Sequence, residues 1–230
     1  WVRKYDSIGN ISWTQSFIGD FSGSGNGIAV DNSGGVFVVG VENSSTKVLK
    51  KLDGNNNGNP LWTQNIIATP YSVDLDSLNN IYITGAFTYQ TWTGKYNSSG
   101  VEQWTKTHTK TGSSEKGTGI SVDSSGNAYI IAQTSGSSSI DILIEGYDTN
   151  GTVLWTQTYD GSGASASHDF GNGIAVDSSG NLYVTARVYF ELWVRKYKQV
   201  ASITTVEGYF KIIGGKDGYI NPNKGEIAVF

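Results

Sequence analysis

Short apolar segments recur along the chain at a nearly constant interval, separated by turns rich in Asp, Asn, Ser and Gly. One such segment ends in aspartate four times: Gly27–Asp31, Ser72–Asp76, Gly119–Asp123 and Gly173–Asp177. The four aspartates are 45, 47 and 54 residues apart. Each is followed by a four-residue turn and a second apolar segment, at 36–39, 81–84, 128–131 and 182–185. Apolar runs of this length between turn residues predict β-strands.

Two further segments complete the repeating unit. A third segment ends in Tyr or Leu, at Tyr5, Leu52, Tyr96, Tyr147 and Tyr197, and a fourth opens with Trp-Thr, at Trp13, Trp62, Trp104 and Trp155. The unit therefore has four strands, here called a, b, c and d. Four consecutive antiparallel strands at this period are typical of a propeller blade. A β-sandwich lacks so regular a period, and a solenoid repeat would be about half as long. We predict an all-β fold, a β-propeller of four-stranded antiparallel blades with about four blades' worth of strands.

The turns support this prediction. Most a–b and c–d connections read Asp or Asn, two small or polar residues, then Gly or Asn. An Asp or Asn side chain at the first position can accept a hydrogen bond from the backbone two residues on, and Gly at the fourth tolerates positive φ. Both kinds of turn lie on one rim of a propeller. The b–c and d–a connections lie on the other rim and vary in length, which predicts binding there.

The tryptophans follow the same repeat. Four of the seven open strand d, and Trp1, Trp92 and Trp193 each precede the tyrosine of strand c by four residues. A tryptophan that recurs once per unit is expected to pack between neighbouring blades rather than to perform chemistry.

Composition narrows the possible partners. The chain of 230 residues has a net charge of −4 and a sequence pI near 5.1, which disfavours nucleic acid and anionic membrane surfaces. It has no cysteine, so disulfides and thiol chemistry are excluded. Its apolar runs are too short to cross a membrane, and no membrane insertion is expected.

Two stretches of sequence carry a resemblance to a known family. Residues 171–185 (GNGIAVDSSGNLYVT) and 4–15 (KYDSIGNISWTQ) resemble the bacterial β-propeller repeat family, and the resemblance covers residues 1–197. It implies a secreted or surface-attached bacterial or archaeal propeller without a common enzymatic activity. We expect the propeller repeats to span 1–200. In the tail, 201–230, Gly214–Glu226 resembles the opening of a hook-capping-type immunoglobulin-like surface domain. The tail is expected to be the start or remnant of a second domain, or a strand donor.

The two ends of the repeat do not match each other. The chain starts with strands c and d (1–17) and ends with a, b and c (173–197), so it has five c strands but four of each other kind. The d strand at 11–17 could complete the last blade and leave one c strand over. Either the chain is a piece of a larger propeller, or another copy completes its open edges. Head-to-tail pairing of copies would produce a filament.

Few residues are candidates for chemistry. The repeated aspartates are expected to form turns rather than a calcium site, since no bidentate Glu accompanies them. The histidines, His108 and His168, lack metal-ligand spacing, so neither metal nor cofactor is expected. His168 and Asp169 lie in the long d–a loop and are the first candidates for ligand binding. A solvated loop histidine is the alternative.

The b–c connections provide the other candidate binding residues. Tyr89, Tyr189 and Glu191 fall in or near them and could hold a sugar, although such residues also cap blade ends. We expect a non-enzymatic extracellular or cell-surface structural or adhesion module, with self-assembly into a fibre as one form of it. Its expected partners are other copies of itself, other surface proteins, or glycans. The alternatives are a lectin-like propeller and, less favoured, a lyase-type propeller enzyme.

Overall fold

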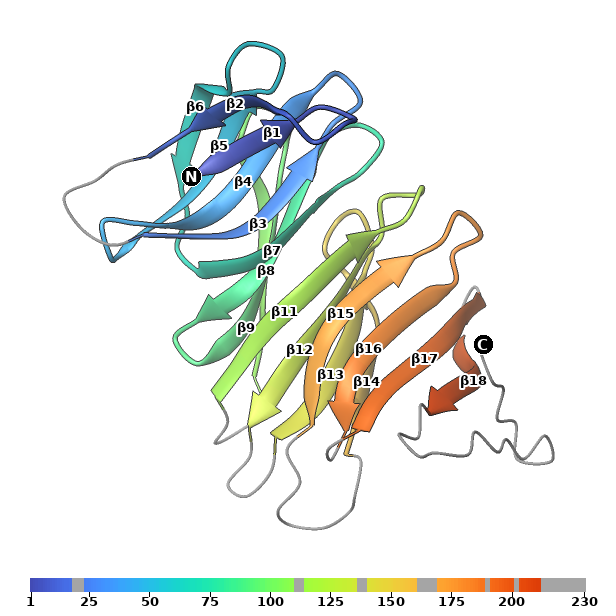
Figure 1. Ribbon diagram of the computed structural model, residues 1–230. Coiled ribbons are helices and arrows are strands. Elements are labelled where there is room, and N and C mark those ends of the chain that lie inside the picture. Colours follow the sequence, from blue (N-terminus) through green and yellow to red (C-terminus); the bar gives the residue numbers. More distant parts are fainter. Residues whose placement is uncertain are drawn as a thin grey trace.

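The computed structural model describes residues 1–17, 23–109, 114–135, 140–160, 169–188, 191–200 and 203–211. This part of the chain consists of strands and turns without a helix, so no helix in it is long and apolar enough to cross a membrane. Its strands form one two-stranded and four four-stranded sheets, and all the pairings are antiparallel between consecutive strands (Figure 1). The predicted all-β propeller of four-stranded blades is confirmed.

The strands group as follows. The N-terminal hairpin holds β1 (Val2–Tyr5) and β2 (Ile11–Gln15). Blade 1 holds β3 (Ser24–Val30), β4 (Gly35–Glu42), β5 (Thr46–Asp53) and β6 (Asn59–Asn65). Blade 2 holds β7 (Thr69–Leu75), β8 (Ile81–Phe87), β9 (Gln90–Tyr96) and β10 (Glu102–His108). Blade 3 holds β11 (Ser114–Val122), β12 (Ala128–Ser135), β13 (Ile140–Tyr147) and β14 (Val153–Tyr159). Blade 4 holds β15 (Phe170–Val176), β16 (Leu182–Val188), β17 (Glu191–Val200) and β18 (Ile203–Lys211).

The fourth strand of blade 4 comes from the tail. β18 pairs with β17 over its whole length, whereas β2 pairs with β1 in a sheet of its own. The idea that the d strand at 11–17 completes the last blade is therefore wrong for this structure. Two local contacts keep β2 beside β1 and blade 1. Asp6 Oδ1 accepts a hydrogen bond from Asn10 N–H in the tight turn between β1 and β2, and Trp13 of β2 packs against blade 1. Residues 214–226, which carry the resemblance to an immunoglobulin-like domain, lie outside the described part.

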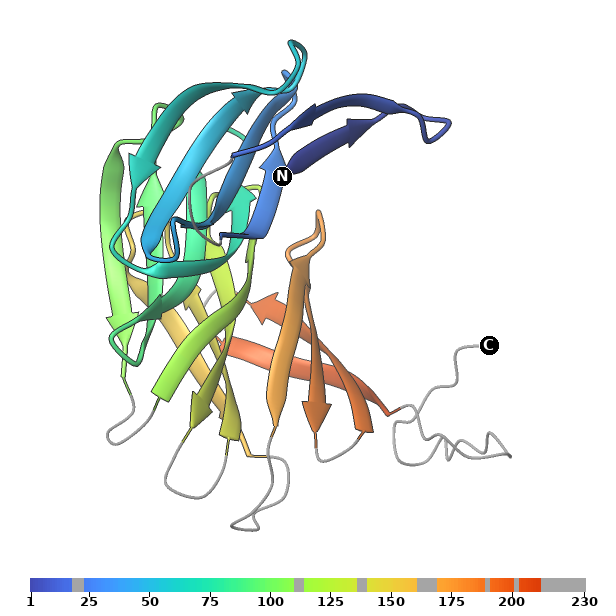
Figure 2. The ribbon, with the colours of Figure 1, turned by 60° about the vertical axis from the view of Figure 1, so that its left-hand side comes forward.

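The sheets stack face to face in an open arc. The first strands of successive blades lie side by side, β3 next to β7, β7 next to β11 and β11 next to β15. The N-terminal hairpin stands at one end of the arc and blade 4 at the other (Figures 1 and 2). No strand pairing joins the two ends within the described residues.

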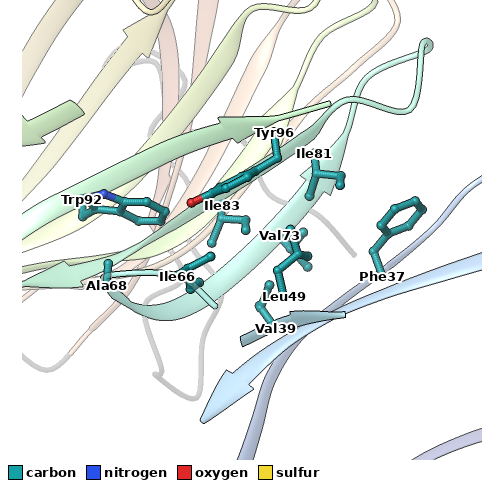
Figure 3. Close-up of a cluster of buried hydrophobic side chains, with 10 residues drawn as sticks. All are labelled: Phe37, Val39, Leu49, Ile66, Ala68, Val73, Ile81, Ile83, Trp92 and Tyr96. Atoms are coloured by element: carbon teal, nitrogen blue, oxygen red, sulfur yellow. The ribbon is translucent and has the colours of Figure 1, made fainter. Parts of the chain in front are cut away.

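The hydrophobic core is divided among the interfaces between sheets. Each of the four apolar clusters joins one sheet to the next along the chain. In the cluster between blades 1 and 2, Phe37, Val39 and Leu49 of blade 1 meet residues of blade 2 such as Ile83 and Trp92 (Figure 3). Stability therefore resides mainly between blades, because this is where apolar area leaves water.

The repeated aspartates build the a–b turns as predicted. Asp123 Oδ1 accepts hydrogen bonds from the backbone N–H of Ser125 and Asn127, at 2.8 and 2.9 Å. Its Oδ2 accepts from the Asn127 amide and the Tyr129 hydroxyl, both at 2.9 Å. Asp76 and Asp177 make the same set of contacts in blades 2 and 4. A carboxylate occupied in this way is a turn former, because its acceptor positions are filled.

The strand-d tryptophans hold neighbouring blades together. Trp13 Nε1 donates to the Gly54 carbonyl of blade 1 at 3.0 Å, and Trp104 Nε1 donates to the Thr149 carbonyl of blade 3 at 3.1 Å. The lysine that precedes the strand-c tyrosine donates to the same carbonyl in both cases, as Lys4 and Lys95. The packing role predicted for these indoles is confirmed. Trp1 is the exception, since 76% of it is exposed.

Candidate functional site

Three of the five residues expected to bind a ligand, Tyr89, Asp169 and Glu191, lie in the described part of the chain, each in or next to a different connection. His168 and Tyr189 lie outside that part. Tyr89 occupies the turn between β8 and β9 at φ 68°, is 74% exposed, and accepts a backbone hydrogen bond from Glu115 N at 2.8 Å. Glu191 is exposed at the start of β17, opposite Val188. Asp169 is fully buried, and its N–H donates to the Ile140 carbonyl at 2.7 Å.

A buried polar cluster lies between blades 2 and 3, and sequence reasoning missed it. Glu145 of β13 is buried, and His108 Nδ1 of β10 lies 3.3 Å from its Oε1. The Thr156 hydroxyl donates to the same oxygen at 2.8 Å, and the Tyr147 hydroxyl donates to Oε2.

The two titrating groups of this cluster shift in opposite directions. Burial by itself would raise the pKa of Glu145, but the hydrogen bonds from His108, Tyr147 and Thr156 outweigh it and hold this pKa below its usual value. The hydrogen bond to Glu145 raises the pKa of His108, against the opposing effect of burial. The pair is therefore most stable as imidazolium and carboxylate.

The position of His108 in the repeat explains the cluster. His108 corresponds to Phe17, Ile66 and Tyr159, the residues four places after the strand-d tryptophan. In the N-terminal hairpin the Phe17 ring lies 5.1 Å from Lys50 Nζ of blade 1, and in blade 3 the Tyr159 ring lies 5.0 Å from the Arg195 guanidinium of blade 4. Lys50, Glu145 and Arg195 occupy one position of strand c. His108–Glu145 is thus a variant of a contact that recurs between blades, and its chemistry serves packing.

No metal site is formed by the described residues, which contain no group of three His, Cys, Asp or Glu side chains placed to hold an ion. In the Glu145 cluster the Thr156 hydroxyl donates to the carboxylate, and burial together with Glu145 raises the pKa of Tyr147. The His108–Glu145 contact joins blades 2 and 3.

A cavity of about 660 Å³ lies at the N-terminal end of the arc. It is bounded by Trp1–Arg3 and Phe17 on one side and by β3, β4 and β5 on the other, with Ile28, Val38 and Val41 in its apolar wall. Neither the residues of the Glu145 cluster nor Tyr89 line it. One feature of the sequence relates to this cavity. The segment Trp1–Tyr5, whose first three residues line it, has the same sequence, WVRKY, as Trp193–Tyr197.

The end faces of the arc are open where inner faces are closed. Ile28 of β3 is 56% exposed, whereas its counterparts Val73 and Ile120 in blades 2 and 3 are 7% and 6% exposed. At the other end Thr185 of β16 is exposed, whereas its counterparts Thr84 and Ile131 are fully buried. Each inner interface packs two blade faces against each other. The corresponding outer face of blade 1 is only partly covered, and that of blade 4 is uncovered.

Comparisons with known proteins agree with the fold. A family described as "Beta-propeller repeat" matches residues 162–187. A crystal structure of a protein of unknown function from Bacteroides caccae aligns with a TM-score of 0.57 and 11% identity over 88% of this chain. The chain spans 65% of that protein. No curated protein matches the chain.

Two further solved structures align less well. A protein from Lactobacillus plantarum gives a TM-score of 0.43 with 16% identity, covering 80% of this chain and 70% of its own. Virginiamycin B lyase from Staphylococcus aureus gives 0.39 with 11% identity, covering 79% and 69%. The Bacteroides structure and the repeat match are therefore the two comparisons that support the fold. Together with the four-stranded sheets they show a β-propeller that contains a propeller repeat of this family's type.

Proposed function

We propose that this protein is a non-enzymatic structural or adhesion module of the cell surface or extracellular space. The observation that carries the proposal is the use of its polar side chains. The turn aspartates accept hydrogen bonds from backbone N–H groups, and His108 and Glu145 join two blades. Among the described residues, these polar side chains are thus occupied in holding the scaffold together.

The open end faces support a role in association. One end of the arc exposes Ile28 and Val30, and the other exposes Ala175 and Thr185. In the inner blades these two kinds of surface are packed against each other. Partners are accordingly other propeller segments, in surface proteins or in further copies of this chain. The resemblance at 4–15 and 171–185 supports the cell-surface setting, and an immunoglobulin-like domain beginning in the tail would suit it.

Association of copies would run head to tail, because the two faces differ, and such contacts do not close into a dimer. Sedimentation velocity over a wide concentration range, followed by electron microscopy, tests this form of the proposal. Linear species that grow with concentration and shrink in a Thr185→Lys variant would support the fibre form. A monomer at every concentration would contradict self-assembly, and the partner would then be a different protein.

Carbohydrate binding is the second candidate, favoured by the exposed Tyr89 ring. An exposed aromatic face on a loop is a common platform for a sugar ring. Glycan-array binding by the parent chain that falls at least about tenfold in Tyr89→Ala would support a lectin. Equal signals from the two chains would leave Tyr89 without a binding role.

A further inference from the structure

The N-terminal hairpin occupies only half of the space that a complete blade fills. Its strands correspond to c and d of the repeat, and Trp13, Val2 and Phe17 pack against Val36 and Leu52 of blade 1. Among the described strands β1 pairs only with β2, and the 660 Å³ cavity lies between Trp1–Arg3 and the strands β3 and β4.

One edge of β1 is unpaired among the described strands, and blade 4 shows how the same sequence is paired on both edges. The pentapeptide WVRKY forms Trp1–Tyr5 in one place and Trp193–Tyr197 in the other. In blade 4 this pentapeptide pairs with β18 on one side and with β16 on the other, where Leu182 lies opposite Tyr197 and Ala186 opposite Trp193. β1 pairs only with β2 among the described strands. Its second edge therefore presents the same backbone groups and side chains that β16 recognises in blade 4.

The uncovered surface of blade 1 has the shape that receives a and b strands elsewhere in the molecule. In blades 3 and 4, Gly117 and Gly171 leave room for a side chain of the preceding b strand. A Cβ at Gly117 would collide with the side chain of Thr84, and one at Gly171 would lie 2.6 Å from Ile131. Gly25 is the counterpart of both in blade 1, and a Cβ there would meet nothing within 4 Å. Blade 1 thus keeps the glycine whose space a preceding b strand would use.

We propose that β1 and this cavity form a receiving site for a β-hairpin of the same propeller repeat, which adds to the free edge of β1 as its a and b strands. The hairpin has the pattern of β15–β16. It carries small residues on the face of strand a that covers Ile28, as Gly173 and Ala175 are, and a tyrosine on strand b, as Tyr183 is. Backbone pairing gives the register, and the apolar wall of the cavity contributes the burial.

Two strands fit this place, and a complete end blade does not. A second copy that approached with blade 4 intact would bring β17 and β18 to the position that β1 and β2 already fill. Moreover, its β16 is already paired with its own WVRKY strand. The inference rests on the proposed role in association, and it names the occupant of one end of the arc.

The test places residues 169–192 directly before Trp1 of the full chain. Leu192 then precedes WVRKY in the new connection, as it does before Trp193, so no artificial linker is needed. We expect hydrogen exchange of the β1 amides to slow by at least about tenfold, because their outer N–H groups gain acceptors. The Tm should rise by roughly 4 °C or more.

Gly25→Val is the matched variant. In the parent chain it has open space and should change the Tm by no more than about 1 °C. In the extended chain it should remove both the slower exchange and the gain in Tm, because the valine occupies the space of the added b strand.

Three outcomes would overturn the inference. They are unchanged β1 exchange in the extended chain, equal behaviour of the extended chain with and without Gly25→Val, and self-association of the parent that Gly25→Val abolishes. The last would make a second copy the occupant. The structural role proposed above is judged separately, by sedimentation and glycan binding of the parent chain.

Discussion

The threonine that follows each strand-d tryptophan shows how one motif serves opposite charges. Thr14 accepts a hydrogen bond from Arg3 Nε at 2.8 Å, and Thr63 accepts one from Lys50 Nζ at 3.0 Å. Thr156 instead donates to the Glu145 carboxylate at 2.8 Å. A hydroxyl both donates and accepts, so the strand-c residue opposite it can be a cation or an anion without a change in the motif.

His108→Phe tests whether the Glu145 cluster serves packing. The substitution leaves the buried carboxylate with only its two hydroxyl partners, and we expect a loss of about 1–3 kcal/mol in the free energy of unfolding. Adding Glu145→Lys recreates the Phe17–Lys50 pair of the neighbouring interface and should restore part of the loss. Urea denaturation of the single and double variants measures both effects. A double variant less stable than His108→Phe would contradict the account.

The same pair predicts a pH dependence. The raised pKa of His108 gives a contribution that is complete below about pH 6.5 and is lost as the pH rises through the folded-state pKa. The lowered pKa of Glu145 gives one that is present above about pH 4.5 and is lost as the pH falls through its folded-state pKa. The difference in Tm between the parent and His108→Phe should therefore shrink from pH 6 to pH 9. A difference that is constant over this range would argue against an ionised pair.

The Glu145 cluster could not have been predicted from the sequence by pattern alone. His108 and Glu145 are 37 residues apart in different repeats, and each looks like an isolated exception within its own unit. Only the stacking of blades shows that the two exceptions face each other. The polar loop that precedes Asp169 predicts an exposed ligand-binding side chain, but Asp169 is buried in the structure.

At the scale of the element, the strands were predictable wherever both the apolar pattern and the turn chemistry repeat. The four a and four b strands, the c strands and the Trp-Thr strands all lie where the pattern placed them. β18 was not recognised as the fourth strand of blade 4, because it lacks the Trp-Thr pair. Gly208 stands opposite Lys196, where Trp13 stands opposite Lys4 in the N-terminal hairpin.

Gly117→Val tests the close approach between blades 2 and 3. A valine at this position would collide with the buried side chain of Thr84, and overpacking of this kind costs about 1–3 kcal/mol. Gly25→Val is the control, since the same substitution at the same repeat position meets open space. Thermal unfolding should show a marked fall in Tm for the first variant and almost none for the second. Equal Tm values would mean that the blades are not packed as described.

At the scale of the whole molecule, the blades form a series of similar interfaces rather than one central core. Each interface combines an apolar cluster with hydrogen bonds that cross between blades, such as Asn26 Nδ2 to the Pro70 carbonyl and Thr118 Oγ1 to that of Gly171. The strand content indicated this stacking, the open ends and the half blade at the N-terminal end (Figure 2), whereas the pairing of β18 with β17 became visible only in the structure. Stability should therefore be highest in blades 2 and 3, which have a neighbour on each face.

The two WVRKY segments allow the most direct test of the free edge of β1 and of the open stack of blades. Their identical side chains give nearly identical intrinsic exchange rates, so hydrogen exchange compares β1 and β17 within one molecule. Since β17 is paired on both edges and β1 on one, we predict that amides of Val194–Tyr197 exchange roughly 100-fold more slowly than those of Val2–Tyr5. Equal protection of the two segments would contradict the free edge of β1, and with it the open stack of blades.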